Sequence, residues 1–542
     1  MRRMKIAAIV IAAFALVVSF GATAKPSAQA QSAEQLRMGI VGDESTLNPY
    51  SYVTGNPGWN MLLLQYDTLY QLDGSGIPQP WLATAATLSD DPLTVVLDLR
   101  DDVTWHDGEA FTAEDVKFTV DYFKEFPQGR FTRNLRSVDT AEVTGDHQVT
   151  LTLTAPNPSL EFGTLADVPI MPEHVWSSIE NPDEANLGIE TNVGTGPYVL
   201  TEYEPDQFYR FEANMEYWAG APEIGELVFV RYADTTGSIA ALQSAEVDML
   251  VNSVPPEQSM LLSGTGDIST IQGPLFTTQM ITYDIDRAPF DQLVVRQAMS
   301  MAINRQDIID TVYLGTGTAG SPGWTHPISV YYNDEITVEH DPEAAAAMLE
   351  EAGIVDSDGD GIRELDGEAL SFEFLTPSNN ALRIRIAELV REMLLEIGID
   401  AQVAVVEQTT WEDAVWPGFD VTQGRNYDMS MWGWSAPIQA DPVRIGSLIH
   451  SDTSIGSLNL TGFGNERVDE LTEELITTLD FDRQVELMAE IQTIVADELP
   501  FIMLLYPDAV YAYRPGVYDN WLFMSGQGVF HKLSFLPADA RP

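Results

Sequence analysis

The chain contains no cysteine. This absence excludes disulfides, a cysteine nucleophile, thiolate metal sites and a lipid-modified N-terminal cysteine. A fold without disulfides depends on its packed interior, and 45% of the residues are hydrophobic. Because 542 residues exceed what one hydrophobic core can organise, we expect two or three lobes.

Lysine is also scarce. The 27 basic residues include only five lysines, against 82 acidic residues, and the net charge is −55. Such a charge argues against a nucleic acid or an anionic lipid as partner. Acidic, lysine-poor surfaces stay hydrated in concentrated salt, which suggests a saline or ion-rich exterior. General acidity of an exported protein explains the charge equally well.

Long apolar runs are absent except at the N-terminus. Three basic residues precede an apolar run from Ile6 to Phe20, which small residues follow. This order is typical of a secretory signal peptide, and the run is short for a bilayer span. We assign residues 1–30 to the signal peptide, with cleavage after Ala24 or Ala30. The mature chain is expected to be exported, periplasmic or extracellular, and soluble.

Familiar catalytic motifs are missing as well. The chain has no GxSxG, no HExxH and no pair of histidines at i,i+4. The glycines of GTGPYVL at 194–200 lack the spacing of a phosphate-binding loop. With 82 carboxylates, some pair will reach the separation found in glycosidases by chance. A secreted glycoside-type hydrolase therefore stays an alternative without a motif to favour it.

Strand and helix patterns alternate throughout and predict an α/β fold. Strand 372–375, helix 381–397 and strand 399–406 form a βαβ unit. Asp341 followed by a proline predicts a helix start, and Thr112 with Asp115 approximates a capping box. One long helical block is expected over 293–309. Two separate strands, 501–505 and 509–513, are expected near the end of the chain.

The stretch from Tyr427 to Pro442 is the first candidate site. Its first half is apolar on both faces, which is typical of a strand buried between layers. Prolines then end the strand, and a loop leaving a strand's carboxyl end is a common ligand site. A core role for either tryptophan is an equal alternative. The expected contacts from this stretch are Trp432, Trp434, Ser435, Gln439 and Asp441.

Several segments, in this order, resemble the family 5 extracytoplasmic solute-binding proteins of ABC importers, the peptide/nickel class. The most specific is the block WHDGEAFTAEDV within residues 80–118. The others are LNPY at 47–50, GTGPY at 194–198, YW at 217–218, VRQAMSMAINR at 295–305, the helix at 341–353, YDMSMWGW at 427–434 and ELPFIMLLY at 498–506. The similarity covers nearly all of the mature chain.

This resemblance implies a two-lobed periplasmic-binding-protein-like fold of type II, with an extra third domain, mixed sheets flanked by helices and a hinged cleft. Lobe I would comprise 33–78, 193–285 and 498–542, its extra subdomain 79–192, and lobe II 286–497. The implied function is capture of a peptide-like or oligosaccharide solute by a monomer and delivery to membrane permease subunits. No chemical step and no required cofactor are implied.

The resemblance also bears on the site residues. Peptide-binding members hold the solute's α-amino group with an aspartate at the place occupied here by Pro437, and Asp441 could replace it only in a rearranged loop. Met431 stands where some oligopeptide binders have arginine. The tryptophans suit a sugar ring or an apolar solute. The family's cleft wall further implies contacts from Tyr52, Thr54, Trp411 and Trp416.

The segment DSDGDGIRELDGE at 356–368 matches the start of a calcium loop. The twelfth position is Gly367, so the bidentate glutamate of that loop is missing. A surface turn rich in Asp-Gly explains the segment equally, whereas a bound ion would be structural. A calcium-dependent surface protein is the third class of function considered. The ligands of a structural Ca²⁺ would be Asp356, Asp358, Asp360, Ile362 and Glu364.

Overall fold

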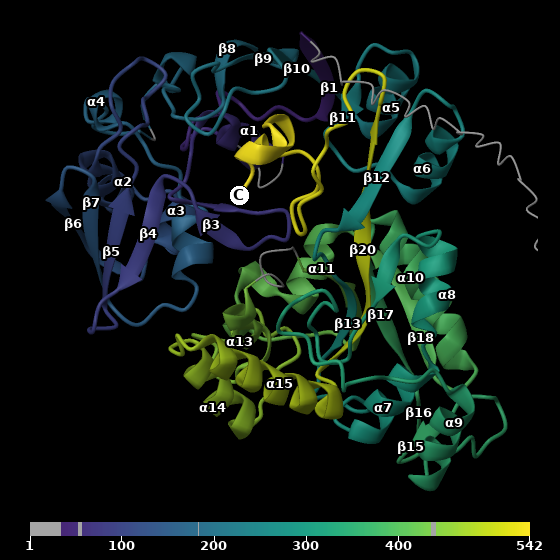
Figure 1. Ribbon diagram of the computed structural model, residues 1–542. Coiled ribbons are helices and arrows are strands. Elements are labelled where there is room, and N and C mark those ends of the chain that lie inside the picture. Colours follow the sequence, from purple (N-terminus) through teal and green to yellow (C-terminus); the bar gives the residue numbers. More distant parts are fainter. Residues whose placement is uncertain (1–33, 53–56, 183, 435–440) are drawn as a thin grey trace, which may run out of the picture.

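The computed structural model describes residues 34–52, 57–182, 184–434 and 441–542. One 13-residue strand, β20 (Phe501–Tyr513), runs through the middle of the molecule and joins two groups of strands (Figure 1). Its first half pairs with β13 and β14, and its second half pairs with β12 and β11. The two strands expected here are therefore one. The partner changes at Pro507 and Asp508, which lie opposite β14 and β12, so pairing continues past the proline.

The first group of strands lies towards the top of Figure 1. The strand order is β20-β11-β1-β10-β9-β8, and β12 pairs with β20 beside this path. β1 runs parallel to β10 and β11, whereas β9 is antiparallel to β8 and β10. The bounds are β1 (Gln35–Val41), β8 (Tyr198–Glu204), β9 (Phe208–Ala213), β10 (Glu226–Tyr232), β11 (Met249–Leu250) and β12 (Ser269–Pro274).

The second group follows the order β18-β17-β19-β13-β20, with β14 beside it. The predicted βαβ unit is confirmed, because β17 pairs in parallel with β18 across α10. The buried strand expected near 427–434 is β19, which lies between β17 and β13. The bounds are β13 (Gln279–Tyr283), β14 (Gly317–Ala319), β17 (Ser371–Pro377), α10 (Ala381–Leu395), β18 (Asp400–Val406) and β19 (Met429–Trp432).

The helical block expected over 293–309 is wrong as one helix. It divides into α7 (Leu293–Ala302) and α8 (Arg305–Val312). Asn304 has an extended backbone, and its side chain accepts a hydrogen bond of 3.1 Å from the backbone N–H of Asp307. Asn304 therefore caps a second helix, because an asparagine oxygen satisfies an unpaired donor of the first turn.

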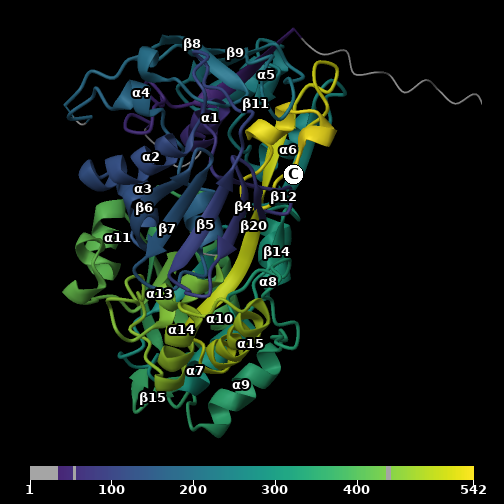
Figure 2. The same cartoon turned by 60° about the vertical axis from the view of Figure 1, so that its left-hand side comes forward.

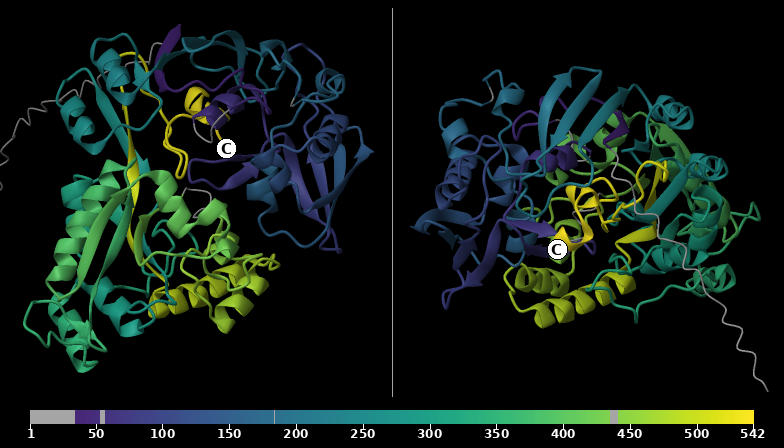
Figure 3. Two further views of the ribbon diagram at one scale, coloured as in Figure 1. Left: turned by 180° about the vertical axis from the view of Figure 1, so that it is seen from behind. Right: turned by 45° about the horizontal axis from the view of Figure 1, so that its top comes forward.

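A separate four-stranded antiparallel sheet, ordered β4-β5-β7-β6, lies at one side of the molecule, away from α8 and α9 (Figures 1 and 3). Helix α2 packs beside it, and the predicted capping box is present, with the Thr112 N–H donating to Asp115 over 2.9 Å. The bounds are β4 (Ala83–Leu88), β5 (Thr94–Leu99), α2 (Ala113–Glu125), β6 (Val138–Gly145) and β7 (Gln148–Leu153).

The remaining helices cover these sheets, and α14 and α15 pack against each other at the bottom of Figure 2. The helix start predicted at Asp341 is confirmed, since its side chain accepts from the Ala344 N–H over 2.8 Å. The bounds are α1 (Gly58–Gln65), α3 (Gly129–Asn134), α4 (Glu173–Trp176), α5 (Thr235–Gln243), α6 (Pro256–Ser263), α9 (Pro342–Glu351), α11 (Gln408–Val415), α13 (Gly446–Ile449), α14 (Glu466–Leu475) and α15 (Phe481–Glu498).

Two small hairpins complete the strands, β2 (Tyr70–Leu72) with β3 (Pro78–Pro80) and β15 (Glu364–Leu365) with β16 (Glu368–Ala369). The division into lobes stays a prediction. β13 and the first half of β20, which the predicted boundaries assign to lobe I, hydrogen-bond into the sheet of β17–β19. None of the helices in the described ranges is both long and apolar enough to span a bilayer.

Candidate functional site

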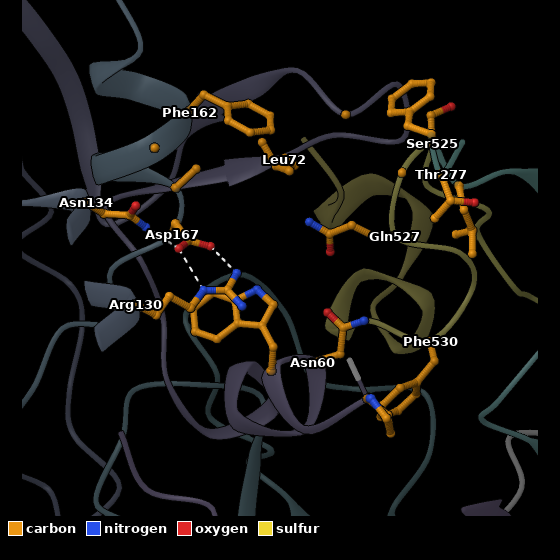
Figure 4. Close-up of a pocket in the computed structure, with 18 of the residues that line it drawn as sticks. Asn60, Leu72, Arg130, Asn134, Phe162, Asp167, Thr277, Ser525, Gln527 and Phe530 are labelled. Atoms are coloured by element: carbon orange, nitrogen blue, oxygen red, sulfur yellow. Dashed lines mark hydrogen bonds and ion pairs between the residues drawn. The ribbon is translucent and has the colours of Figure 1, made fainter. Parts of the chain in front are cut away.

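A cavity of about 750 Å³ lies among segments that are far apart in the sequence (Figure 4). Its wall comes from α1, the β2–β3 hairpin, α3, the π-helical turn η1 (Leu160–Leu165), residues 275–277 and residues 525–530. One residue, Arg444, comes from the 3-10 turn η5 (Pro442–Ile445). Six aromatic side chains contribute to the wall: Tyr52, Trp59, Phe162, Phe276, Tyr511 and Phe530.

Arg130 on α3 is held firmly in this wall. Its Nε donates to Asp167 Oδ2 over 2.9 Å, and its Nη2 donates to the second oxygen of that carboxylate. The guanidinium carbon lies 4.1 Å from the centre of the Trp59 ring, a cation–π distance. Asn134 also donates to Asp167. Arg130 is thus held by Asp167 and Trp59, and the dashed lines in Figure 4 mark its bonds to Asp167.

Two further arginines line the same cavity. Arg444 lies beside the carboxylate of Asp441, with 3.5 Å between Nε and Oδ2. Arg133, one turn along α3 from Arg130, is exposed and forms no ion pair among the described residues. Partial burial and the positive charges of Arg444 and Arg130 lower the pKa of the Arg133 guanidinium. The cavity therefore has a positive wall in a chain of charge −55.

Asp441, predicted as a solute contact, is 6% exposed and caps η5. Its Oδ1 accepts a hydrogen bond of 2.9 Å from Ser159 Oγ and one of 3.2 Å from the Val443 N–H. Burial raises the pKa of Asp441, and the nearby charge of Arg444 opposes this only in part. Its carboxylate is occupied within the protein and adjoins the cavity through Arg444.

The four predicted tryptophans form one cluster. Trp411 is fully buried, stacks on Trp432 with ring centres 4.0 Å apart, and donates from Nε1 to Ser430. Trp434 meets Trp432 and Trp416 edge to face, at 5.9 and 5.6 Å. None of the four belongs to the described lining of the 750 Å³ cavity. Their contact with a solute stays a prediction.

Tyr52 does line the cavity, and its ring packs against Trp59 and Phe131. Thr54, Ser435 and Gln439 lie outside the described residues, as does the predicted signal peptide. The arginine wall, formed by Arg130, Arg133 and Arg444, was not predicted from the sequence. A signal for its α3 part existed, because Arg130, Arg133 and Arg136 recur every third residue in a strongly acidic chain. The approach of Arg444 had no local signal.

The 356–368 segment brings three of its predicted calcium ligands together. One carboxylate oxygen from each of Asp356, Asp358 and Glu364 lies within 4.8 Å of the others. Asp360 and Ile362 are outside this group, and the Asp360 carboxylate accepts from the Ile362 N–H over 2.8 Å. The Asp356 carboxylate also accepts from loop N–H groups, as an Asp-Gly turn requires. Calcium binding stays a prediction.

Taken together, sheets joined through one long strand and an aromatic, positively charged cavity define a protein that holds a small solute. Residues 78–454 match the family described as "Bacterial extracellular solute-binding proteins, family 5 Middle". The chain belongs to this family, as the sequence resemblance indicated. Members are transport components that act outside the cytoplasm and catalyse no reaction, so the prediction of a non-enzyme is confirmed.

Relatives support this assignment. The chain is 25% identical to the oligopeptide-binding protein AppA of Bacillus subtilis over 500 residues, which covers 90% of this chain and 89% of AppA. It is also 25% identical to the di/tripeptide-binding protein 3 of Pseudomonas aeruginosa over 523 residues, which covers 92% and 94%.

Solved structures agree on the fold. AppA of Bacillus subtilis in complex with a nonapeptide has a TM-score of 0.69 at 24% identity, covering 95% of this chain and 99% of that one. NikA of Brucella suis in complex with Fe(III)-EDTA has a TM-score of 0.78 at 22% identity, covering 91% and 98%. The prediction of a two-lobed α/β binding-protein fold is confirmed.

Proposed function

We propose that the protein captures a short peptide in the 750 Å³ cavity and delivers it to the permease of an ABC importer. The observation that carries the proposal is the make-up of the cavity wall. Segments from both ends of the chain bring aromatic rings together with amide and guanidinium groups. Apolar surface with a few directed polar groups is typical of small-solute sites of about 300–1,000 Å³. The peptide-binding names of the relatives support a peptide as the solute.

An oligosaccharide is the second candidate solute. Trp59 and Tyr52 in the wall offer ring faces on which sugars stack, and so does the tryptophan cluster if it contacts the solute as predicted. The proline at position 437, where the resemblance places an amine-binding aspartate, favours this candidate over a peptide held by its α-amino group. A peptide that is bound through groups other than its α-amino group is compatible both with the proline at position 437 and with the peptide-binding names of the relatives.

We place the movement of the lobes at β20, because this strand is shared by both groups of strands. Opening at this hinge would separate η1 from η5, which the hydrogen bond between Ser159 and Asp441 holds together in the present structure. In this proposal the protein is exported by its signal peptide and acts as a monomer in a periplasm or at the cell exterior. Its partner is the membrane permease.

A thermal-shift screen of the processed protein tests the function. The panel contains di- to hexapeptides, neutral oligosaccharides and divalent metal ions. A ligand present at a hundred times its dissociation constant adds about 2.7 kcal/mol to the free energy of unfolding. We expect a raised melting temperature with peptides. A shift with sugars alone selects the second candidate, and no shift with either class contradicts the proposal.

A further inference from the structure

Arg133 differs from the other two arginines of the cavity in having no acidic partner. Arg130 is bound to Asp167 and Arg444 to Asp441. No carboxylate of the described residues lies within ion-pair distance of Arg133. The chain has three acidic residues for every basic one, so an acidic partner is easily supplied. Several arginines of the described residues, Arg136 among them, form no ion pair, and Arg133 is the one of these that lines the cavity.

The neighbouring aspartates are already engaged. Asp167 accepts hydrogen bonds from Arg130 and from Asn134. Asp441 accepts from Ser159 and from the Val443 N–H. Moving either carboxylate towards Arg133 would break these bonds. The surplus positive charge of the wall is thus fixed by the way the two aspartates are bound.

Position and access also single out Arg133. It lies on α3, where the Gln128 side chain caps the first turn by accepting from the Arg130 and Phe131 N–H groups. Its side chain lines the cavity and is exposed, so a solute can reach it. Arg444 reaches the same cavity from η5 and is close enough for its charge to act on Arg133. The positive charge comes from both sides of the cavity.

We propose that Arg133, supported by Arg444, binds a carboxylate group of the solute. This inference rests on the proposed function and names what the solute must carry. A guanidinium presents donors in a planar fork that matches both oxygens of a carboxylate. Arg130 is not assigned to the solute, because the two donors that would bind a carboxylate of the solute already bind the carboxylate of Asp167. The carboxylate can be a peptide's C-terminus, an acidic side chain or a uronic acid.

Isothermal titration calorimetry tests the inference with matched ligands. The first pair is a tripeptide with a free C-terminus and the same peptide as its C-terminal amide. The second pair is a neutral tripeptide amide and one with a central glutamate. The third pair is a neutral oligosaccharide and an oligogalacturonate. These pairs distinguish the three sources of the carboxylate.

The protein variants are R133Q, R133K and the control R136Q. Arg136 lies just after the end of α3 and does not line the cavity. R136Q therefore removes the same charge as R133Q without altering the cavity wall. In the wild type and in R136Q, we expect at least one carboxylate ligand to bind about tenfold or more tightly than its neutral partner. R133Q should abolish this ratio, and R133K should keep part of it because the charge remains without the fork. Melting curves confirm that each variant is folded.

The results distinguish a failure of the carboxylate inference from a failure of the proposed function. If the wild type binds peptides or sugars but shows ratios near one in all three pairs, the inference is wrong and the proposed function stands. The inference is also wrong if R133Q weakens both members of a pair equally. If the wild type binds no ligand of the panel, the proposed function itself is contradicted.

Discussion

Ser159 donates a hydrogen bond of 2.9 Å to Asp441, joining two residues that are 282 positions apart. Ser159 is the residue before η1, and Asp441 is the residue before η5. Both turns contribute to the wall of the cavity. This bond therefore ties together the two sides of the proposed site.

Replacing Asp441 with asparagine should strengthen carboxylate binding. The Asn oxygen can still accept from Ser159 and from the Val443 N–H, but the negative charge beside Arg444 is lost. We expect D441N to bind the preferred carboxylate ligand several-fold more tightly in calorimetry, with its neutral partner unchanged. S159A is the control, because it removes the bond and leaves the charges. Weaker binding of the carboxylate ligand by a folded D441N would contradict the account.

Lys532 and Asp67 form an ion pair that is essentially inaccessible to solvent. Trp81, Thr195 and Tyr217 also donate to the Asp67 carboxylate. K532M should lower the free energy of unfolding by about 3–5 kcal/mol, because it leaves a buried charge without its partner. The double variant K532M/D67N should recover part of this loss. Urea denaturation gives the free energy of unfolding of the wild type, K532M, D67N and the double variant. If the losses in the two single variants add up to the loss in the double variant, the two residues are not coupled.

Burial lowers the pKa of His531 from 6.5 to about 4, with Arg541 and Lys532 adding to the effect. The unfolded chain takes up a proton between these values and the folded chain does not. The free energy of unfolding should therefore fall as the pH drops from 6.5 towards 4, by about 3 kcal/mol for this residue. In H531Q the corresponding slope should be shallower. Equal slopes for the two proteins in urea denaturation would exclude this role.

The tryptophan cluster allows ligand contact and packing to be separated. W432A removes the ring stacked on Trp411 and should cost about 3 kcal/mol of stability. W434F keeps an aromatic ring and should leave the melt nearly unchanged. If Trp434 touches the solute as predicted, W434F weakens binding by about tenfold. Unchanged affinity in W434F would leave Trp434 as a packing residue only.

The predicted calcium site in the 356–364 loop can be tested by adding the ion. If the 356–364 loop binds the ion, millimolar CaCl₂ should raise the melting temperature, by an amount equivalent to about 2.7 kcal/mol at a hundred times the dissociation constant. The double variant D356N/D358N should lose the shift, since both residues belong to the carboxylate group. A shift of the same size in the double variant would assign the effect to general screening of acidic charge.

Local signals in the sequence predicted much of the fold. The helix start at Asp341 and the unit β17-α10-β18 depend on neighbouring residues, so pattern alone identifies them. The break at Asn304 was missed because apolar spacing continues across it. The continuity of β20 was missed because its two halves pair with different strands, which no local pattern reports.

The site was harder to predict than the fold. The stretch after β19 was identified from a buried strand that ends in prolines, and its Asp441 does adjoin the cavity through Arg444. The arginine wall depends on α3 and η5 meeting in space. The pairing of Lys532 with Asp67, 465 positions apart, likewise depends on long-range folding. Convergence of this kind leaves no periodic signal in one sequence.

The most direct test of the account is equilibrium dialysis of the processed protein against a short peptide with a free C-terminus, followed by mass spectrometry of the recovered peptide. The account predicts one peptide retained per chain, returned chemically intact, with retention reduced about tenfold or more in R133Q. A cleaved peptide would contradict a binding protein without a chemical step. Equal retention by the wild type and R133Q would contradict the carboxylate site.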